Sequence, residues 1–173
     1  MVYKNSILII LPATNFSETE YLSVKTVLAN SGFNTFTASD ANGLCVGQNG
    51  LKVKADVSFF NMHENNFIAI IFIGGPGVKK YWINPALHSI ANKFQIKNKI
   101  IGAICSSPVI LAKAGLLSGR EATCFESDKQ ELEKEGVAYK NLPIVISKNI
   151  ITANGPSSAY NFAEKFVEKI KFN

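Results

Sequence analysis

Short, wholly apolar segments alternate along this chain with longer segments in which apolar residues recur every three or four positions. SILIILP (residues 6–12) and FIAIIFI (67–73) have the length of strands and little polar alternation, which is typical of strands buried on both faces. Residues 18–31 show helical spacing instead and are followed by Gly32, a common helix terminator. Buried strands joined by helices form a parallel sheet with helices on both faces. The alternation therefore predicts a flavodoxin-like, doubly wound α/β sandwich with a mostly parallel sheet.

The same signals place the other elements. We expect strands at 6–12, 33–38, 67–73, 99–104 and 122–125, a strand pair at 144–151 and a small edge hairpin at 45–56. Helices are expected at 18–31, 84–97, 108–114, 129–136 and 158–171. A chain of 173 residues with 47% hydrophobic content can bury one sizeable core but is short for two. We therefore predict a single domain spanning residues 1–173.

Composition narrows the classes of function. No apolar run reaches about 18 residues, so we expect no membrane-spanning segment. The three cysteines (Cys45, Cys105, Cys124) lack the spacing of a zinc site or a disulfide framework, so we expect no metal, no cofactor and a reducing cytoplasm. The net charge of +5 comes from scattered lysines and a single arginine, Arg120, a pattern that does not favour nucleic-acid binding.

Cys105 is the strongest candidate for chemistry. It follows a buried strand and precedes Ser106-Ser107-Pro108, which open a helix, and ligands of doubly wound folds bind at such strand-to-helix turns. A helix N-terminus lowers the pKa of a thiol, and a tight turn lifts its side chain off the backbone. The alternative is that Cys105 is a buried hydrophobic residue of the core.

Two further turns are expected at the same edge of the sheet. Gly74-Gly75-Pro76-Gly77 follows the strand at 67–73, and its backbone N–H groups, with that of Ser106, could form an oxyanion hole. The turn after the first strand leads to Glu20, whose carboxyl could reach the cysteine. Glu20 also completes a capping box with Ser17, so it could serve only to cap its helix.

Taken together, these motifs resemble the ThiJ/PfpI family of the DJ superfamily, which includes intracellular proteases, glyoxalases and deglycases. The resemblance covers nearly the whole chain. It rests on N-F-x-x-x-E ending at Glu20, I-G-G at 73–75, A-I-C-x-x-P at 103–108 and Gly155-Pro156 before the last helix. It implies a class I glutamine amidotransferase-like fold, a homodimer, and catalysis of small-molecule chemistry without a cofactor or metal.

The resemblance also implies roles for individual residues. Cys105 would be the nucleophile, held in a strained backbone conformation, with a protonated Glu20 hydrogen-bonded to its sulfur. Gly75 and Ser106 would supply oxyanion N–H groups. The remaining pocket candidates are Gly74, Ser107, Phe125, Gly155 and Pro156.

The chain departs from the protease-like branch, which carries a histidine directly after the cysteine. That position is Ser106 here, Ser107 replaces a glycine, and neither His63 nor His88 lies where the family places a histidine. Peptide hydrolysis is therefore the least favoured function, because the amine leaving group needs a proton and no histidine is expected beside the cysteine to supply it.

Three hypotheses remain open at this stage. The first is a cysteine-dependent glyoxalase or deglycase that acts on small reactive aldehydes in stress defence. The second is an oxidative-stress sensor or chaperone-like dimer with Cys105 as a redox switch, and the third is a binding module that keeps only the fold. Among the other thiols, Cys45, between Gly43 and Gly47, is expected to be more exposed than Cys124.

Overall fold

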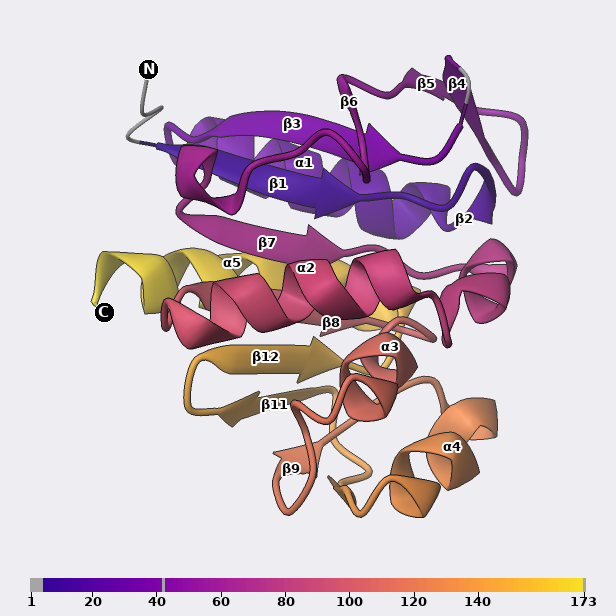
Figure 1. Cartoon of the computed structure of the whole chain (residues 1–173), viewed down its shortest axis with the longest axis vertical. Coiled ribbons are helices and arrows are strands. Elements are labelled where there is room, and N and C mark those ends of the chain that lie inside the picture. Colours follow the sequence, from indigo (N-terminus) through magenta and orange to yellow (C-terminus); the bar gives the residue numbers. More distant parts are fainter. Residues whose placement is uncertain (1–4, 42, 173) are drawn as a thin grey trace.

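The computed structural model describes residues 5–41 and 43–172, and a seven-stranded sheet forms its centre (Figure 1). In spatial order the strands are β11 (Ile144–Ser147), β12 (Ile150–Ala153), β8 (Ile100–Ile104), β7 (Ala69–Phe72), β1 (Ser6–Ile10), β3 (Asn34–Ser39) and β6 (Val57–Ser58). All neighbouring strands run parallel except β11 and β12, which are antiparallel. The mostly parallel sheet predicted from the sequence is thus confirmed.

Helices cover both faces of this sheet. α1 (Glu18–Asn30) and α5 (Ala159–Lys171) pack on one face, while α2 (Pro85–Ile96) and α3 (Pro108–Lys113) pack on the other (Figure 1). The short α4 (Lys129–Lys134) lies beside α3. Within residues 5–41 and 43–172, no helix is both long and apolar enough to cross a membrane.

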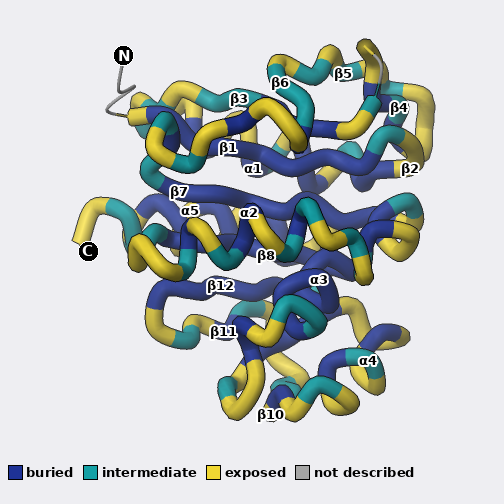
Figure 2. The backbone as a smooth tube through the Cα atoms, in the orientation of Figure 1, coloured by how far each residue is buried: buried dark blue, intermediate teal, exposed yellow. Residues whose placement is uncertain are grey.

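The buried strands supply the core. All residues of β1, β7, β8 and β12 are buried, and Figure 2 shows these strands in dark blue, whereas exposed, yellow stretches lie on α2 and in the loops. Burying each large aliphatic or aromatic side chain contributes about 1.5–3 kcal/mol, which explains why these runs carry no polar alternation. The carboxyl ends of these strands meet at one edge of the sheet, and the turns that follow them build the site.

Two small sheets lie outside the central one. β2 (Thr14–Phe16), β4 (Leu44–Gly47) and β5 (Lys52–Lys54) form a three-stranded sheet, so the predicted hairpin pairs with β2 rather than with the edge of the main sheet. β9 (Glu121–Ala122) and β10 (Ala138–Tyr139) form the other. The strand expected at 122–125 ends at Ala122.

The predicted exposure of Cys45 is wrong, because this side chain is fully buried, as is that of Cys124. In β4 the side chains alternate, so Leu44 faces solvent while Cys45 points into the core beside α1. The neighbouring glycines therefore mark turns and not an exposed thiol.

Candidate active site

Cys105 lies directly after β8 and has the left-handed backbone conformation, with φ of 64°. Its N–H donates to Ala153 O at 2.9 Å, and its own carbonyl accepts from the Phe125 N–H at 2.8 Å. A non-glycine residue in this region costs about 1–2 kcal/mol and persists only when its surroundings fix it. Two neighbouring segments therefore hold Cys105 in a strained elbow.

The glycine turn after β7 presses against this elbow. A Cβ on Gly74 would lie 2.5 Å from the Cys105 Cβ, and a Cβ on Gly75, where φ is 109°, would lie 2.4 Å from the Ser17 nitrogen. The absence of side chains lets the backbone come close to the thiol, and the backbone N–H groups of Gly75 and Ser106 both lower the pKa of Cys105. These are the two N–H groups that the sequence assigned to an oxyanion hole.

Glu20 brings its carboxyl to the same place from the first turn of α1. Its side chain is fully buried, and Oε2 accepts from the Gly74 N–H at 2.9 Å. Oε1 has no hydrogen-bond partner among the residues that the structure describes. The Ser17 hydroxyl does cap the helix, accepting from the Glu20 N–H at 3.5 Å, but the Ser17 N–H donates to Gly74 O. The capping box is therefore only half formed, and the Glu20 carboxyl faces the cysteine instead.

Burial decides the protonation of Glu20. It raises the pKa of this carboxyl to about 7, against the lowering effect of hydrogen bonds from Gly74, Cys105 and Ser17. Near neutral pH the carboxyl is thus divided between its acid and its carboxylate forms. A protonated Glu20 was expected from the family resemblance, and this pKa brings that state within reach at pH 7 and below.

For Cys105 the direction expected from the helix N-terminus is wrong. Burial, followed by the charge of ionised Glu20, raises the pKa of the Cys105 thiol to about 12, while hydrogen bonds from Gly75 and Ser106 lower it. Helix α3 has only six residues, and the sulfur belongs to a residue that is 7% exposed, so desolvation outweighs the helix dipole. The two groups form a coupled pair in which one charge strongly disfavours the second.

A cavity of about 360 Å³ opens above the pair. Its lining residues are Ser17, Glu20, Gln48, Gly75, Pro76, Lys79, Cys105, Ser106, Phe125 and Pro156. A cavity of this volume accommodates a small organic molecule. Within the described part of the chain, no group of three or more His, Cys, Asp or Glu side chains could hold a metal ion.

Three of the predicted pocket residues lie outside this lining. Ser107 is fully buried, and its hydroxyl contacts Phe72 O at 2.7 Å. The same hydroxyl accepts from the Ile104 N–H at 2.9 Å, so Ser107 stabilises the backbone turn at Cys105. Gly74 is packed beneath Cys105, and Gly155 lies against the Phe125 ring. All three shape the site without facing the cavity.

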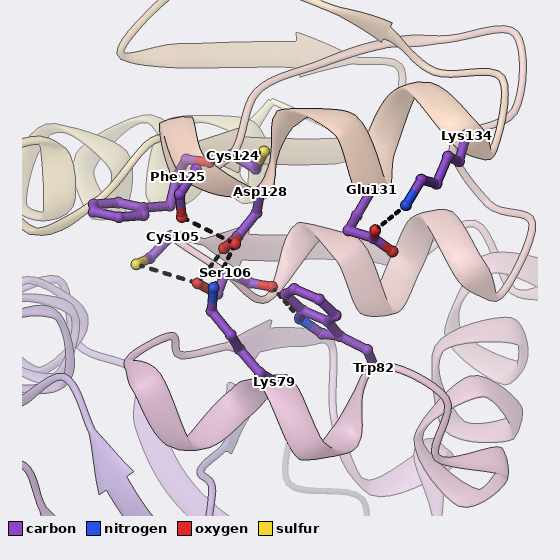
Figure 3. Close-up of polar contacts among 10 residues, drawn as sticks. Lys79, Trp82, Cys105, Ser106, Cys124, Phe125, Asp128, Glu131 and Lys134 are labelled. Atoms are coloured by element: carbon purple, nitrogen blue, oxygen red, sulfur yellow. Dashed lines mark hydrogen bonds and ion pairs between the residues drawn. The ribbon is translucent and has the colours of Figure 1, made fainter.

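A polar cluster that no sequence motif indicated lies beside Ser106 (Figure 3). The Asp128 side chain is only 2% exposed, and it accepts from the Ser106 hydroxyl at 2.5 Å and from Lys79 Nζ at 2.6 Å. Neither histidine reaches the pocket, since His88 Nε2 contacts Trp82 O at 2.8 Å and His63 is exposed in a loop. The position of the protease-branch histidine is thus taken by a serine that is anchored to a buried carboxylate.

Comparison with known proteins gives consistent matches. The model of the DJ-1/PfpI family matches residues 5–169. A glutathione-independent glyoxalase of Caenorhabditis elegans is 31% identical, covering 99% of this chain and 91% of that protein. A deglycase of Pyrococcus horikoshii is 29% identical, covering 93% of this chain and 97% of that protein. The crystal structure of a ThiJ/PfpI domain protein from Brachyspira murdochii superposes with a TM-score of 0.95 at 30% identity, covering 98% of both chains.

Proposed function

The chain belongs to the DJ-1/PfpI family, and we propose that it is a cysteine-dependent, cofactor-free enzyme acting on small reactive aldehydes such as methylglyoxal. The observation that carries this proposal is the Cys105–Glu20 pair, which lines a small cavity. The Cys105 thiol stands on a strained backbone turn, and the buried Glu20 carboxyl beside it has a pKa of about 7. The relatives named as a glyoxalase and a deglycase support it.

The first step joins the aldehyde to the protein. The Cys105 sulfur attacks the aldehyde carbon, a C–S bond forms, the carbonyl π bond breaks, and the thiol proton ends on the former aldehyde oxygen. A thiol with a pKa of about 12 cannot supply much free thiolate at neutral pH, so the proton must leave as the bond forms. Ionised Glu20 is the adjacent group that can accept it and pass it on.

The second step moves a proton within the resulting hemithioacetal. The Glu20 carboxylate takes the proton from the carbon bonded to sulfur and returns it to the neighbouring carbonyl carbon. The hydroxyl proton of the hemithioacetal passes at the same time to the former carbonyl oxygen, which gives a thioester of a 2-hydroxy acid. Water then hydrolyses the thioester and restores the thiol. Methylglyoxal and one water become lactic acid, and no external oxidant or reductant is required. The N–H groups of Gly75 and Ser106 would stabilise negative charge that develops on oxygen in these steps.

The other hypotheses receive different support. Deglycation starts from the same addition of the thiol, so it belongs to this proposal. The redox-sensor alternative is favoured by one observation: Cys105 lines the cavity, while Cys45 and Cys124 are fully buried. Peptide hydrolysis has no support in the pocket, where Ser106 donates to Asp128. The homodimer implied by the family and the reducing cytoplasm inferred from the cysteine pattern remain part of the proposal.

The test is the conversion of methylglyoxal to lactate by the wild type and by the Cys105→Ser, Glu20→Gln and Cys45→Ala variants. We expect turnover by the wild type and by Cys45→Ala, whose thiol lies away from the cavity, and loss of turnover in the other two. Turnover that survives in Cys105→Ser would reject the enzyme proposal. A wild type that only becomes oxidised at Cys105 by peroxide would favour the sensor.

A further inference from the structure

Among the described residues that line the cavity, Lys79 is the one with a positively charged side chain. It lies in the short helix η2 (Pro76–Tyr81), directly after the glycine turn that contacts the Cys105 sulfur. The same short segment therefore places the Gly75 N–H near the sulfur and the Lys79 ammonium at the wall of the cavity.

The ammonium is held in place by two contacts. Asp128 Oδ1 lies 2.6 Å from Lys79 Nζ, and the Trp82 ring centroid lies 5.3 Å from it, a cation–π distance (Figure 3). Trp82 is itself fixed, because its Nε1–H donates to Ser106 O at 2.9 Å. Ordering a lysine side chain around a ligand costs conformational entropy. Because these contacts already order Lys79, part of that entropy is lost before a ligand binds.

In the Lys79–Asp128 ion pair, the lysine lines the cavity and the aspartate does not. The Lys79 side chain is 46% exposed, whereas that of Asp128 is 2% exposed and has its second oxygen occupied by the Ser106 hydroxyl. An ammonium has three protons, and one contact with Asp128 leaves others for a ligand. Among the described residues, the other titratable groups that line the cavity are Cys105 and Glu20. Burial raises the pKa of Glu20 to about 7, so this carboxyl carries only part of its negative charge near neutral pH.

We propose that Lys79, held by Asp128 and Trp82, is an anion-recognition group of this cavity, and that its preferred aldehydes carry a carboxylate or another anionic group. The substrate class is then an α-oxoaldehyde with an acidic tail, for which 4,5-dioxopentanoate is a simple representative. The choice of substrate rests on the proposed function, whereas the anion site itself does not. With this compound the chemistry described above would add one water and yield 2-hydroxypentanedioate.

The anion site can be tested without any turnover. Iodoacetate and iodoacetamide alkylate the same thiolate and differ mainly in that iodoacetate is an anion. The ratio of their rates at Cys105, measured by peptide mass spectrometry, cancels any change in the thiol pKa. We expect this ratio to exceed that of a free small thiol and to fall about two- to fivefold in Lys79→Met, the range for a partly exposed ion pair. Added salt should reduce the ratio in the wild type because it screens the ammonium.

Matched variants separate the charge from the fold. Lys79→Arg should keep the ratio, and Asp128→Asn should raise it because the ammonium loses its counter-ion. Lys80→Met is the control, since Lys80 Nζ lies 4.9 Å from the Tyr81 ring centroid and does not line the cavity. A ratio that is the same in the wild type and Lys79→Met, or that falls equally in Lys80→Met, would overturn the anion site.

Turnover of 4,5-dioxopentanoate and methylglyoxal separates this inference from the proposed function. We expect a higher kcat/KM for 4,5-dioxopentanoate in the wild type and loss of that preference in Lys79→Met. If neither compound is consumed while the alkylation ratio still depends on Lys79, the aldehyde activity fails and the anion site stands. If both are consumed and Lys79→Met leaves their relative kcat/KM unchanged, the assigned substrate class is wrong.

Discussion

Replacing Glu20 by glutamine should change how the stability of the protein depends on pH. In the folded state burial raises the pKa of Glu20 from 4.5 to about 7, and the side chain is fully buried. The folded protein therefore binds this proton more tightly than the unfolded chain does. The stabilisation from the protonated carboxyl is fully present below pH 4.5 and is lost as the pH rises through about 7.

The magnitude follows from the two pKa values. Each step of one in pKa corresponds to about 1.4 kcal/mol, so a rise from 4.5 to about 7 costs about 3 kcal/mol once the group must ionise. Glutamine has nearly the same shape and cannot ionise. Between about pH 4.5 and pH 8, the wild type should therefore lose about 3 kcal/mol of unfolding free energy relative to Glu20→Gln.

Urea denaturation of both proteins across this pH range measures the difference directly. All other titrating groups are common to the two proteins, so their contributions cancel to a first approximation. Glu18→Gln is a matched control, because Glu18 lies two residues earlier on α1 and accepts from the Asn49 N–H at 2.8 Å at the protein surface. A stability difference between wild type and Glu20→Gln that does not vary with pH would refute the raised pKa of Glu20.

Three further predictions concern the local structure of the site. Gly74→Ala should lose about 1–3 kcal/mol of unfolding free energy, because its Cβ would lie 2.5 Å from the Cys105 Cβ; urea denaturation would contradict this by showing wild-type stability. Cys105→Gly should be about 1 kcal/mol more stable than Cys105→Ala, since both lose the sulfur but only alanine keeps a Cβ at a φ of 64°; the opposite order would mean that the elbow is not strained. Glu18→Ala should speed hydrogen exchange severalfold at the Asn49 and Leu51 amides, which donate to Glu18 Oε1 at 2.8 and 2.9 Å. These two hydrogen bonds hold the hairpin loop that contains Gln48, a residue that lines the cavity. In that experiment, amides of β8 serve as the reference, and equal rates at 49 and 51 would argue against the anchor.

The sequence predicted the central sheet because its signals are local. Strands such as β1 and β7 are short runs of apolar residues, and helices such as α2 begin with Asn84 as the N-cap and Pro85 in the first turn. β2 was missed because three residues between two turns carry no periodic signal. Cys45 was misjudged because exposure was inferred from nearby glycines, whereas the alternation of β4 decides which way the thiol points.

The candidate site was only partly readable for a related reason. Cys105, Gly75 and Glu20 lie in recognisable motifs that follow β8, β7 and β1, which are neighbours in the sheet, so their meeting follows from the topology. Lys79 and Asp128 are 49 positions apart and belong to no motif, and only the fold shows that they meet. The direction of the Cys105 pKa also depends on burial, which no short motif encodes.

The most direct test of the central claim is to trap the adduct between Cys105 and methylglyoxal. Glu20→Gln keeps the thiol, which adds to the aldehyde more slowly without the carboxylate but still reaches equilibrium with the help of water. The variant cannot move the carbon-bound proton, so with ¹³C-labelled methylglyoxal it should accumulate a hemithioacetal visible by NMR. We predict this signal in Glu20→Gln and its absence in the Glu20→Gln/Cys105→Ser double variant. A signal that persists in the double variant, or one that never forms while lactate is still produced, would contradict Cys105 as the nucleophile and Glu20 as its proton-transfer partner.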